Sequence, residues 1–222
     1  MVLIKCSECG SKISDTASVC PQCGSKSIIK KATKNSKKKP IITIIIIALF
    51  IILLTFGTLF IIHKNKVSTY KENYEEILDK MLDSIDRTED CLILYRKVWY
   101  NTIFEKEDSE TNEYTKDSNG RFNDDFNDSL LELWIDKEYS NEISIIKEES
   151  YITIPELFKK LKNPPKEMKD AFEDLEELYD TYLSFTEMAI NPSGSLTSFT
   201  EKYNELDSEL SKQYKKAYRN ID

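Results

Sequence analysis

Residues 41–62 read IITIIIIALFIILLTFGTLFII, 22 consecutive positions without a charged side chain. Ten isoleucines, four leucines and three phenylalanines make this stretch apolar on every face of a helix. A helix adds about 1.5 Å per residue, so about 20 apolar residues cross a hydrocarbon core roughly 30 Å thick. We therefore predict one transmembrane helix over residues 41–62. The run is long, starts late and lacks a small-residue cleavage site, so we expect a permanent anchor.

The apolar run divides the chain into parts of different composition. Residues 1–26 contain four of the five cysteines, residues 27–40 are rich in lysine, and residues 63–222 are acidic. The first 40 residues carry nine lysines against two acidic side chains, and the remainder carries 22 basic and 37 acidic residues. We predict a small metal-binding domain, a lysine-rich linker, one span and a separate helical domain.

The four N-terminal cysteines have the spacing of a metal site. Cys6, Cys9, Cys20 and Cys23 form C-x2-C-x10-C-x2-C, and a glycine follows each pair. A C-x2-C turn directs two thiolates at one ion, and the glycine relieves the steric cost of that turn. Two such turns predict one structural Zn²⁺ held by four thiolates, with no position left for catalysis. A disulfide framework is the competing interpretation of four cysteines.

The sequences KCSECG and VCPQCG resemble the short zinc ribbon found at the N-terminus of many bacterial membrane proteins. The resemblance covers about residues 4 to 24 and implies a zinc site but no particular function. The order of ribbon, lysine linker, single span and further domain is similar to Gram-positive envelope proteins, which include the teicoplanin-resistance-associated membrane proteins. No motif beyond the span matches that group, so only the architecture carries over.

Two arguments predict the orientation of the span. The 20 residues before it contain seven lysines and the 20 after it contain four, and positively charged flanks stay in the cytoplasm. Zinc thiolates also persist best in a reducing compartment. We therefore expect the N-terminus in the cytoplasm and residues 63–222 outside the cell membrane. The lysine run lacks neighbouring aromatic or arginine side chains, which disfavours nucleic acid and favours contact with anionic lipid.

Residues 63–222 show helical periodicity throughout. From Lys64 to Glu107 there is no Gly or Pro, and apolar residues recur mostly three or four apart, so the span is free to continue into this helix. The stripe is Tyr70, Tyr74, Ile77, Met81, Ile85, Leu92, Tyr95, Trp99 and Ile103. A loop over residues 108–120 precedes a second helix beginning near Arg121, which either extends through Ile146 or ends before a separate short element.

Two further helices are predicted near the C-terminus. Asn163 is expected to cap the first of them, whose stripe includes Phe172. A cap at Ser195 or Ser198, with a capping box between Ser198 and Glu201, starts the last helix. Its stripe includes Phe199. Short turns between long stripes predict an all-α antiparallel bundle.

Catalytic residues are poorly represented. The only histidine, His63, adjoins the span, so a histidine-dependent triad is excluded from residues 64–222. The carboxylates of Glu173, Glu176, Glu177 and Asp180 are interpreted as a solvated helix face. Asp124, Asp125 and Asp128 lack the order of a calcium loop. The lone Cys91 is expected to be a packed core residue, with an intermolecular disulfide as the alternative.

These features predict a membrane protein that is not an enzyme. We expect the lipid bilayer and proteins on one or both sides of it as partners. The sequence leaves the choice between monomer and homodimer open. The leading hypothesis is a helical domain that binds or senses an envelope component, with a ribbon that contacts a cytosolic protein. The alternative is a purely structural or assembly role, in which the ribbon is only a folded N-terminal module.

Overall fold

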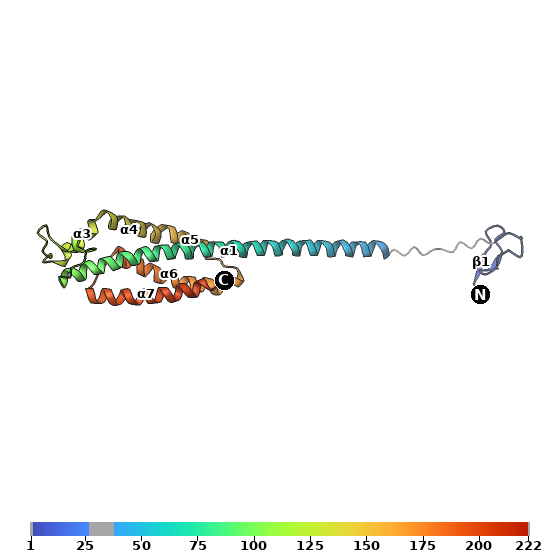
Figure 1. The fold of residues 1–222 in the computed structure, drawn as a ribbon. Coiled ribbons are helices and arrows are strands. Elements are labelled where there is room, and N and C mark those ends of the chain that lie inside the picture. Colours follow the sequence, from blue (N-terminus) through green and yellow to red (C-terminus); the bar gives the residue numbers. More distant parts are fainter. Residues whose placement is uncertain (1, 27–37, 222) are drawn as a thin grey trace. The chain divides into compact units, whose positions relative to one another are not determined.

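The computed structural model describes residues 2–26 and 38–221, and the chain forms two compact units, Met1–Gly57 and Thr58–Asp222. Of the lysine-rich linker predicted over residues 27–40, positions 27–37 lie outside the described residues. The elements labelled in Figure 1 and those between them are β1 (Leu3–Lys5), β2 (Lys12–Ser14), α1 (Lys38–Ile103), α2 (Asn112–Thr115), α3 (Phe126–Ile135), α4 (Lys137–Glu148), the π-helix η1 (Glu149–Thr153), α5 (Ile154–Leu161), the 3₁₀ turn η2 (Lys166–Met168), α6 (Lys169–Ile190) and α7 (Leu196–Tyr218).

The first unit begins with a small antiparallel hairpin. β1 pairs with β2 in a register that places Ile4 opposite Ile13. The buried side chains of this region are Cys6, Ile13 and Cys20, with Ile4 partly buried against them. Three buried side chains are far too few to hold a fold by apolar burial alone. Another source of stability is therefore required here.

Helix α1 is continuous from the apolar run into the helical domain. Every side chain described between Thr43 and Ile62 is exposed, and the segment is long and apolar enough to cross a membrane. From Tyr70 onward the same helix buries one face. This confirms that no break separates the apolar run from the helix that follows.

Helices α4 and α5 run antiparallel to α1. The hydroxyl of Tyr70, near the apolar run, donates to the carbonyl of Leu161 at the end of α5, at 3.0 Å. Further along α1, Arg87 forms an ion pair with Glu142 of α4. Along α1 from Tyr70 to Arg87, the contacted residue moves back from Leu161 to Glu142. Helix α1 and the α4–α5 segment therefore run in opposite directions.

Helices α6 and α7 complete a four-helix arrangement with up-down connectivity. Tyr74 of α1 donates to the carbonyl of Ala171 in α6 at 2.9 Å and to that of Ala217 in α7 at 3.3 Å. Ser84 lies 2.9 Å from the hydroxyl of Tyr182 in α6, so α6 runs parallel to α1. Helix α7 follows a short turn and packs back along α6, as Figure 1 shows. The predicted antiparallel bundle is the observed fold.

The core lies where the predicted stripes meet. The largest fully buried side chains are Tyr74, Tyr182, Phe185, Ile77, Leu78, Met81, Leu92, Leu133, Ile146, Ile154, Leu161 and Leu175. Two stripe positions differ from expectation. Ile103 is 45% exposed at the end of α1, and Phe172 is only partly buried at the edge of the cluster. Periodicity places a residue on a helix face but not at the centre of the packing.

Some predicted boundaries were wrong. α1 ends at Ile103, the last residue of its predicted stripe, but the predicted loop over 108–120 contains the short helix α2. The next helix begins at Phe126 rather than Arg121, because the Asp125 side chain accepts the N–H of Asn127 as its N-cap. The isoleucines up to Ile146 belong to a separate helix, α4, which is the second of the two predicted alternatives.

The break between α3 and α4 has a local cause. The Asp136 side chain accepts the backbone N–H groups of Glu138 and Tyr139. Its ψ of 137° is outside the helical range, so the chain cannot continue α3 through this residue. An aspartate that could have sat on the surface of one long helix instead ends one helix and begins another.

The two predicted caps fared differently. Asn163 does not cap α6, because Pro165 adopts an extended ψ of 156° and the chain first forms η2. For α7, Ser195 is the N-cap, and the Ser195 and Ser198 side chains each accept the other's backbone N–H. The capping box therefore joins these two serines, and the predicted pairing of Ser198 with Glu201 was wrong.

Candidate metal centre

The two cysteine turns have the same backbone geometry. Gly10 N–H donates to the Cys6 carbonyl at 3.0 Å, and Gly24 N–H donates to the Cys20 carbonyl at 2.9 Å. Gly10 has φ of +74° and Gly24 has φ of +67°, a region that residues with a Cβ rarely adopt. Both glycines are therefore required by the turns, as the sequence predicted.

The four sulfur atoms converge on one point. The Cys6 and Cys23 sulfurs lie 3.7 Å apart, as do those of Cys9 and Cys20, and all four lie within 4.8 Å of one another. A tetrahedral zinc with bonds of about 2.3 Å requires sulfur separations of about 3.8 Å. A disulfide requires about 2.05 Å, and all four cysteines are free. The geometry fits one zinc ion and disfavours the disulfide interpretation.

Two serines contact the sulfur atoms from equivalent positions. The Ser25 hydroxyl lies 3.1 Å from the Cys23 sulfur and 3.6 Å from that of Cys6, while Ser11 lies 3.4 Å from the Cys9 sulfur. Each serine follows the glycine of its turn. Neither serine was predicted from the sequence, although the repeated tetrapeptide CGSK, at residues 9–12 and 23–26, indicates both of them.

The surroundings of the sulfurs favour ionisation of one side of the cluster. The backbone N–H of Cys9, the hydroxyl of Ser25 and the N–H of Glu8 hydrogen-bond the Cys6 sulfur and lower its pKa to about 6. The hydroxyl and backbone of Ser11 lower the pKa of Cys9. Hydrogen bonds to a thiolate stabilise its charge, and zinc requires deprotonated ligands.

Cys20 differs because it is the most enclosed of the four. The N–H groups of Gln22 and Cys23 lower its pKa, but burial and the neighbouring Cys23 and Cys6 sulfurs outweigh them and raise it to about 11. A divalent cation would offset this cost by placing positive charge among the four sulfurs. The donor set is closed, so zinc here would stabilise the fold and hold no reactive water.

Among the described residues, the other sequence candidates lie on exposed surfaces or, for Cys91, in the core. Glu173, Glu176, Glu177 and Asp180 are exposed on α6, which agrees with the solvated-face interpretation. Asp124, Asp125 and Asp128 are exposed beside the start of α3. His63 lies 2.9 Å from Glu167, which precedes α6. Cys91 is buried, as predicted for a packed core residue.

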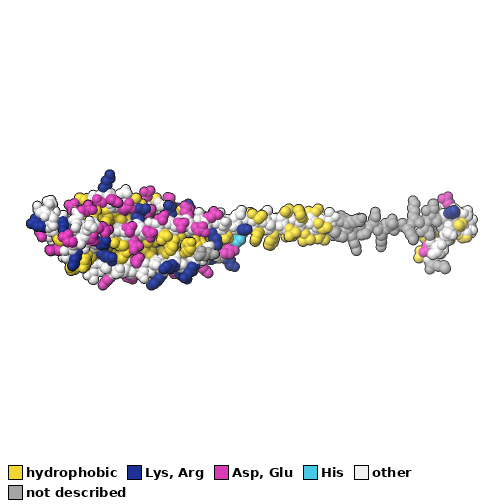
Figure 2. Space-filling view, viewed as in Figure 1, with side chains coloured by type: hydrophobic (Ala, Val, Ile, Leu, Met, Phe, Trp, Pro, Cys, Tyr) yellow, Lys and Arg dark blue, Asp and Glu magenta, His cyan; other side chains and the backbone are white. Residues whose placement is uncertain are grey.

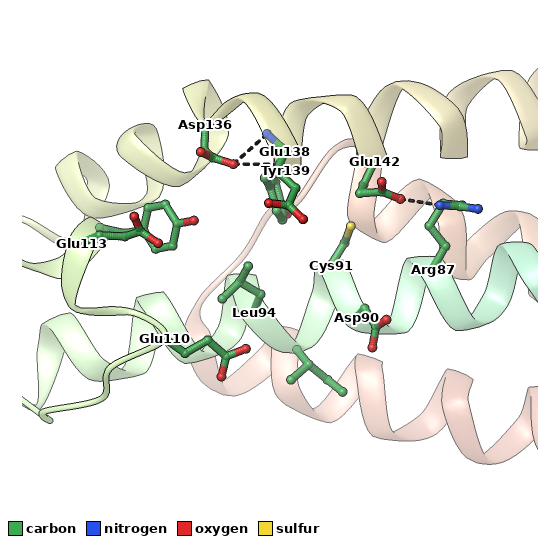
Figure 3. Close-up of a pocket in the computed structure, with 12 residues that line it drawn as sticks. Arg87, Asp90, Cys91, Leu94, Glu110, Glu113, Asp136, Glu138, Tyr139 and Glu142 are labelled. Atoms are coloured by element: carbon green, nitrogen blue, oxygen red, sulfur yellow. Dashed lines mark hydrogen bonds and ion pairs between the residues drawn. The ribbon is translucent and has the colours of Figure 1, made fainter.

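A polar pocket of about 680 Å³ adjoins Cys91, as Figure 3 shows. Its carboxylates are Asp90, Glu110, Glu113, Asp136, Glu138 and Glu142. Glu142 pairs with Arg87, Glu110 pairs with Lys97, and Asp136 caps α4. The fold itself thus accounts for half of these acidic groups. Burial together with nearby carboxylates raises the pKa of the Cys91 thiol to about 12, which keeps it protonated.

Comparison with known proteins agrees with the geometry of the N-terminal unit. Residues 5–27 match the family of zinc-ribbon domains. Comparison with curated proteins gave no match, and comparison with solved structures gave none. The match and the four converging sulfurs together identify the N-terminal part of this chain as a zinc-ribbon domain, followed by one helix able to span a membrane.

Proposed function

We propose that this protein is a non-catalytic, single-pass membrane protein of the cell envelope. Its zinc ribbon lies in the cytosol and contacts a protein there. Its helical domain lies on the opposite side of the membrane and binds or senses a component of the envelope. The envelope assignment rests on the order of domains, which resembles that of Gram-positive envelope proteins.

The observation that carries this proposal is the continuity of α1. One helix contains both the apolar run and the face that forms the bundle core from Tyr70 to Trp99. Helix α1 is assigned without interruption from the apolar run to Ile103, which supports a role in which a change in the bundle reaches the span through one helix. Such a connection suits a protein that responds on one side of a membrane to an event on the other.

The non-catalytic part of the proposal is supported by the chemistry of the metal centre. Four thiolates fill a tetrahedral zinc, and a catalytic zinc keeps one position open for water or substrate. The orientation is supported by the lysine excess before the apolar run and by the need of thiolate ligands for a reducing compartment. Both arguments favour a cytosolic ribbon.

The proposal is tested by cross-linking in cells and purification of the intact chain from detergent. Proteins recovered with the wild type are compared with those recovered with a form lacking residues 1–26 and with Cys20→Ser. Ser7→Ala is the matched control, because Ser7 lies exposed within the first turn and is no zinc ligand. Loss of particular partners with the first two variants, and not with Ser7→Ala, supports recruitment by the ribbon.

Identical partners for all four forms would contradict the ribbon contact and favour the purely structural role. Orientation is checked separately by adding protease to intact cells from which the wall has been removed. We expect digestion of residues 63–222 and protection of the ribbon. Digestion of the ribbon in intact cells would overturn the proposed orientation.

A further inference from the structure

Three segments far apart in the sequence meet at one end of the helical domain, and we call this surface the basic end. They are residues 63–71 of α1, residues 159–170 around the turn from α5 to α6, and residues 212–221 at the end of α7. The first two are joined by the Tyr70 hydroxyl, which donates to the Leu161 carbonyl at 3.0 Å. This is the end at which α1 continues into the apolar run.

Further contacts fix the same juxtaposition. His63, directly after the apolar run, lies 2.9 Å from Glu167 in the second segment. Lys216 of the third segment pairs with Asp174 of α6 at 2.8 Å, and Asn220 hydrogen-bonds the same carboxylate at 2.9 Å. The three segments therefore lie at the same end of a single compact unit, the third joined to it through Asp174 of α6.

The charge of this surface is opposite to that of the rest of the domain. The three segments contain three, five and four basic side chains, which make 12 of the 22 basic residues after position 40. They contain only Glu167 and Asp170 of the 37 acidic residues. The three segments thus have a formal charge of +10, and Asp174 and Glu177, which both pair with Lys216, lower the charge of this surface to +8, while the remainder beyond position 40 has −23. Figure 2 shows dark-blue side chains near the cyan His63 at this end.

Most of these positive charges are available to a partner. Eleven of the 12 basic side chains are exposed, and Lys71 is half-buried. Ten exposed ones form no ion pair with a described carboxylate: Lys64, Lys66, Lys159, Lys160, Lys162, Lys166, Lys169, Lys212, Lys215 and Arg219. The domain gains little internal stabilisation from them, and their mutual repulsion opposes placing them together.

The position of the surface identifies its partner. If residues 41–62 fill the hydrocarbon core, His63 lies at the boundary, and Lys66 lies about 6 Å beyond Ile62 along the helix. The lipid headgroup layer is about 5–7 Å thick on each side of a bilayer. The contact of His63 with Glu167 brings the turn from α5 to α6 to the same level. The lysines of that turn then lie within about 10 Å of the lipid phosphates, the distance over which charges interact at ordinary salt.

We infer that the basic end is a docking surface for the headgroups of anionic phospholipids in the leaflet from which α1 emerges. The inference rests on the proposed membrane span but not on its orientation. Binding would hold the helical domain against the bilayer through its lysines. The acidic remainder of the domain, repelled by the same lipids, would be directed away from the surface.

The test uses the full-length chain in phosphatidylcholine liposomes that contain phosphatidylglycerol. In one preparation the phosphatidylglycerol carries a photoactivatable headgroup, and in the other the phosphatidylcholine does. Cross-linked peptides are mapped by mass spectrometry. We expect phosphatidylglycerol to label residues 159–170 and 212–221 at least about fivefold more than phosphatidylcholine. Raising NaCl from 50 to 500 mM should remove most of this preference, because the screening length falls to about 4 Å.

A matched pair of variants separates this surface from charge in general. Replacing Lys159, Lys160, Lys162 and Lys166 with Gln should remove most of the preference for phosphatidylglycerol, leaving about twofold or less. The control replaces Lys106, Lys137, Lys147 and Lys202, which are exposed and lie outside the three segments, and should leave labelling unchanged. The lysines of residues 30–39 are intact in both variants, so their attraction to lipid cancels from the comparison. The salt series on the wild type tests the same electrostatics without any variant.

Three outcomes would overturn the inference. These are equal labelling by both lipids, labelling that salt does not change, and a four-lysine variant that labels as the wild type does. The last result combined with loss of binding to soluble polyphosphate would assign the surface to a free polyanion. A photoactivatable acyl chain that fails to label residues 41–62 would show that the span itself is wrong, which distinguishes failure of the proposed function from failure of the lipid surface.

Discussion

The zinc ribbon and the helical domain are stabilised in different ways. The ribbon buries Cys6, Ile13 and Cys20 as its core, whereas the helical domain buries a cluster of 33 residues. In the ribbon, four sulfur atoms lie within 4.8 Å of one another, and this arrangement stabilises the fold only when a cation binds among them. In the helical domain, apolar surface removed from water is the main favourable term. We therefore expect that the ribbon depends on metal and that the helical domain folds without it.

Removing zinc should give the largest difference between the two units. Structural zinc contributes on the order of 10–16 kcal/mol in small zinc domains. A strong chelator, or Cys20→Ser, should therefore unfold the ribbon and leave the thermal unfolding of the helical domain unchanged. Dispersed amide signals of residues 2–26 in an NMR spectrum report on the ribbon, and far-ultraviolet circular dichroism reports on the helices. Ser7→Ala should keep zinc at one ion per chain.

A ribbon that stays folded with the chelator would remove the contrast between the units. The same holds for a purified ribbon with less than one zinc per chain and a disulfide between its cysteines.

Truncating the centre of the helical core should give the next largest effect. Phe199 is 2% exposed and contacts the rings of Tyr95 and Trp99. In a fragment spanning residues 64–222, Phe199→Ala should cost about 3–5 kcal/mol in urea denaturation, because a cavity replaces the ring. Phe172→Ala should cost less, since Phe172 lies at the edge of the cluster, and Glu173→Ala should cost under about 0.5 kcal/mol.

Equal costs for the two phenylalanines would show that burial does not rank the core positions. A fragment that needs zinc to fold would contradict the independence of the helical domain.

A buried hydrogen bond between α1 and α6 should contribute a smaller amount. Tyr182 is fully buried, and its hydroxyl lies 2.9 Å from that of Ser84, which is also buried. Tyr182→Phe leaves the Ser84 hydroxyl without this partner and should cost about 1–3 kcal/mol. The double variant with Ser84→Ala should recover part of the loss, because neither polar group is then buried alone. A double variant that is less stable than the sum of the single changes would exclude this account.

The smallest effect on the helical domain concerns alkaline pH, and the ribbon responds to pH in the opposite direction. Burial raises the pKa of Tyr74 and Tyr203 to about 12, and that of the Cys91 thiol to about 12. Their protonated forms are favoured by folding, so stability is fully present below the pKa values of the unfolded chain. It is lost as pH rises from about 9 toward 12. The ribbon should instead lose zinc as pH falls, because protons compete for the thiolates.

Urea midpoints of the fragment at pH 7, 9 and 10.5 measure the loss of stability at alkaline pH. Cys91→Ser should reduce the part of this loss that occurs at the lower end of the alkaline range.

In the native fragment, Cys91 should react slowly with iodoacetamide at pH 8, and rapidly once the fragment is unfolded. Fast reaction of the native fragment would show that the thiol is not buried.

The metal centre was predictable from sequence because its geometry is local. Each pair of ligands lies in one turn, and each turn is completed by hydrogen bonds between residues at most five apart, such as Gly10 to Cys6. Positive φ at the glycine can be inferred from the residue type alone. The apolar run was equally plain, because the length and composition of one segment decide whether a helix can cross a membrane.

Boundaries within the helical domain were predicted less well, because local and distant contacts compete there. Asp136 is equally acceptable on the surface of one long helix and as the cap between two. The choice depends on packing of α3 and α4 against other helices, which periodicity does not contain. Asn163 had the right residue type for a cap, but the two prolines after it directed the chain into η2.

The sequence by itself determined that this chain has a four-cysteine metal site, one apolar helix and amphipathic helices beyond it. Only the tertiary structure decided that α1 is continuous into the bundle core, that Phe199 is central and Phe172 peripheral, and that lysines from three distant segments share one end. The physical reason is the range of the interactions. Turns, ligand pairs and helix periodicity depend on neighbours in the chain, whereas burial and surface charge depend on which segments meet in space.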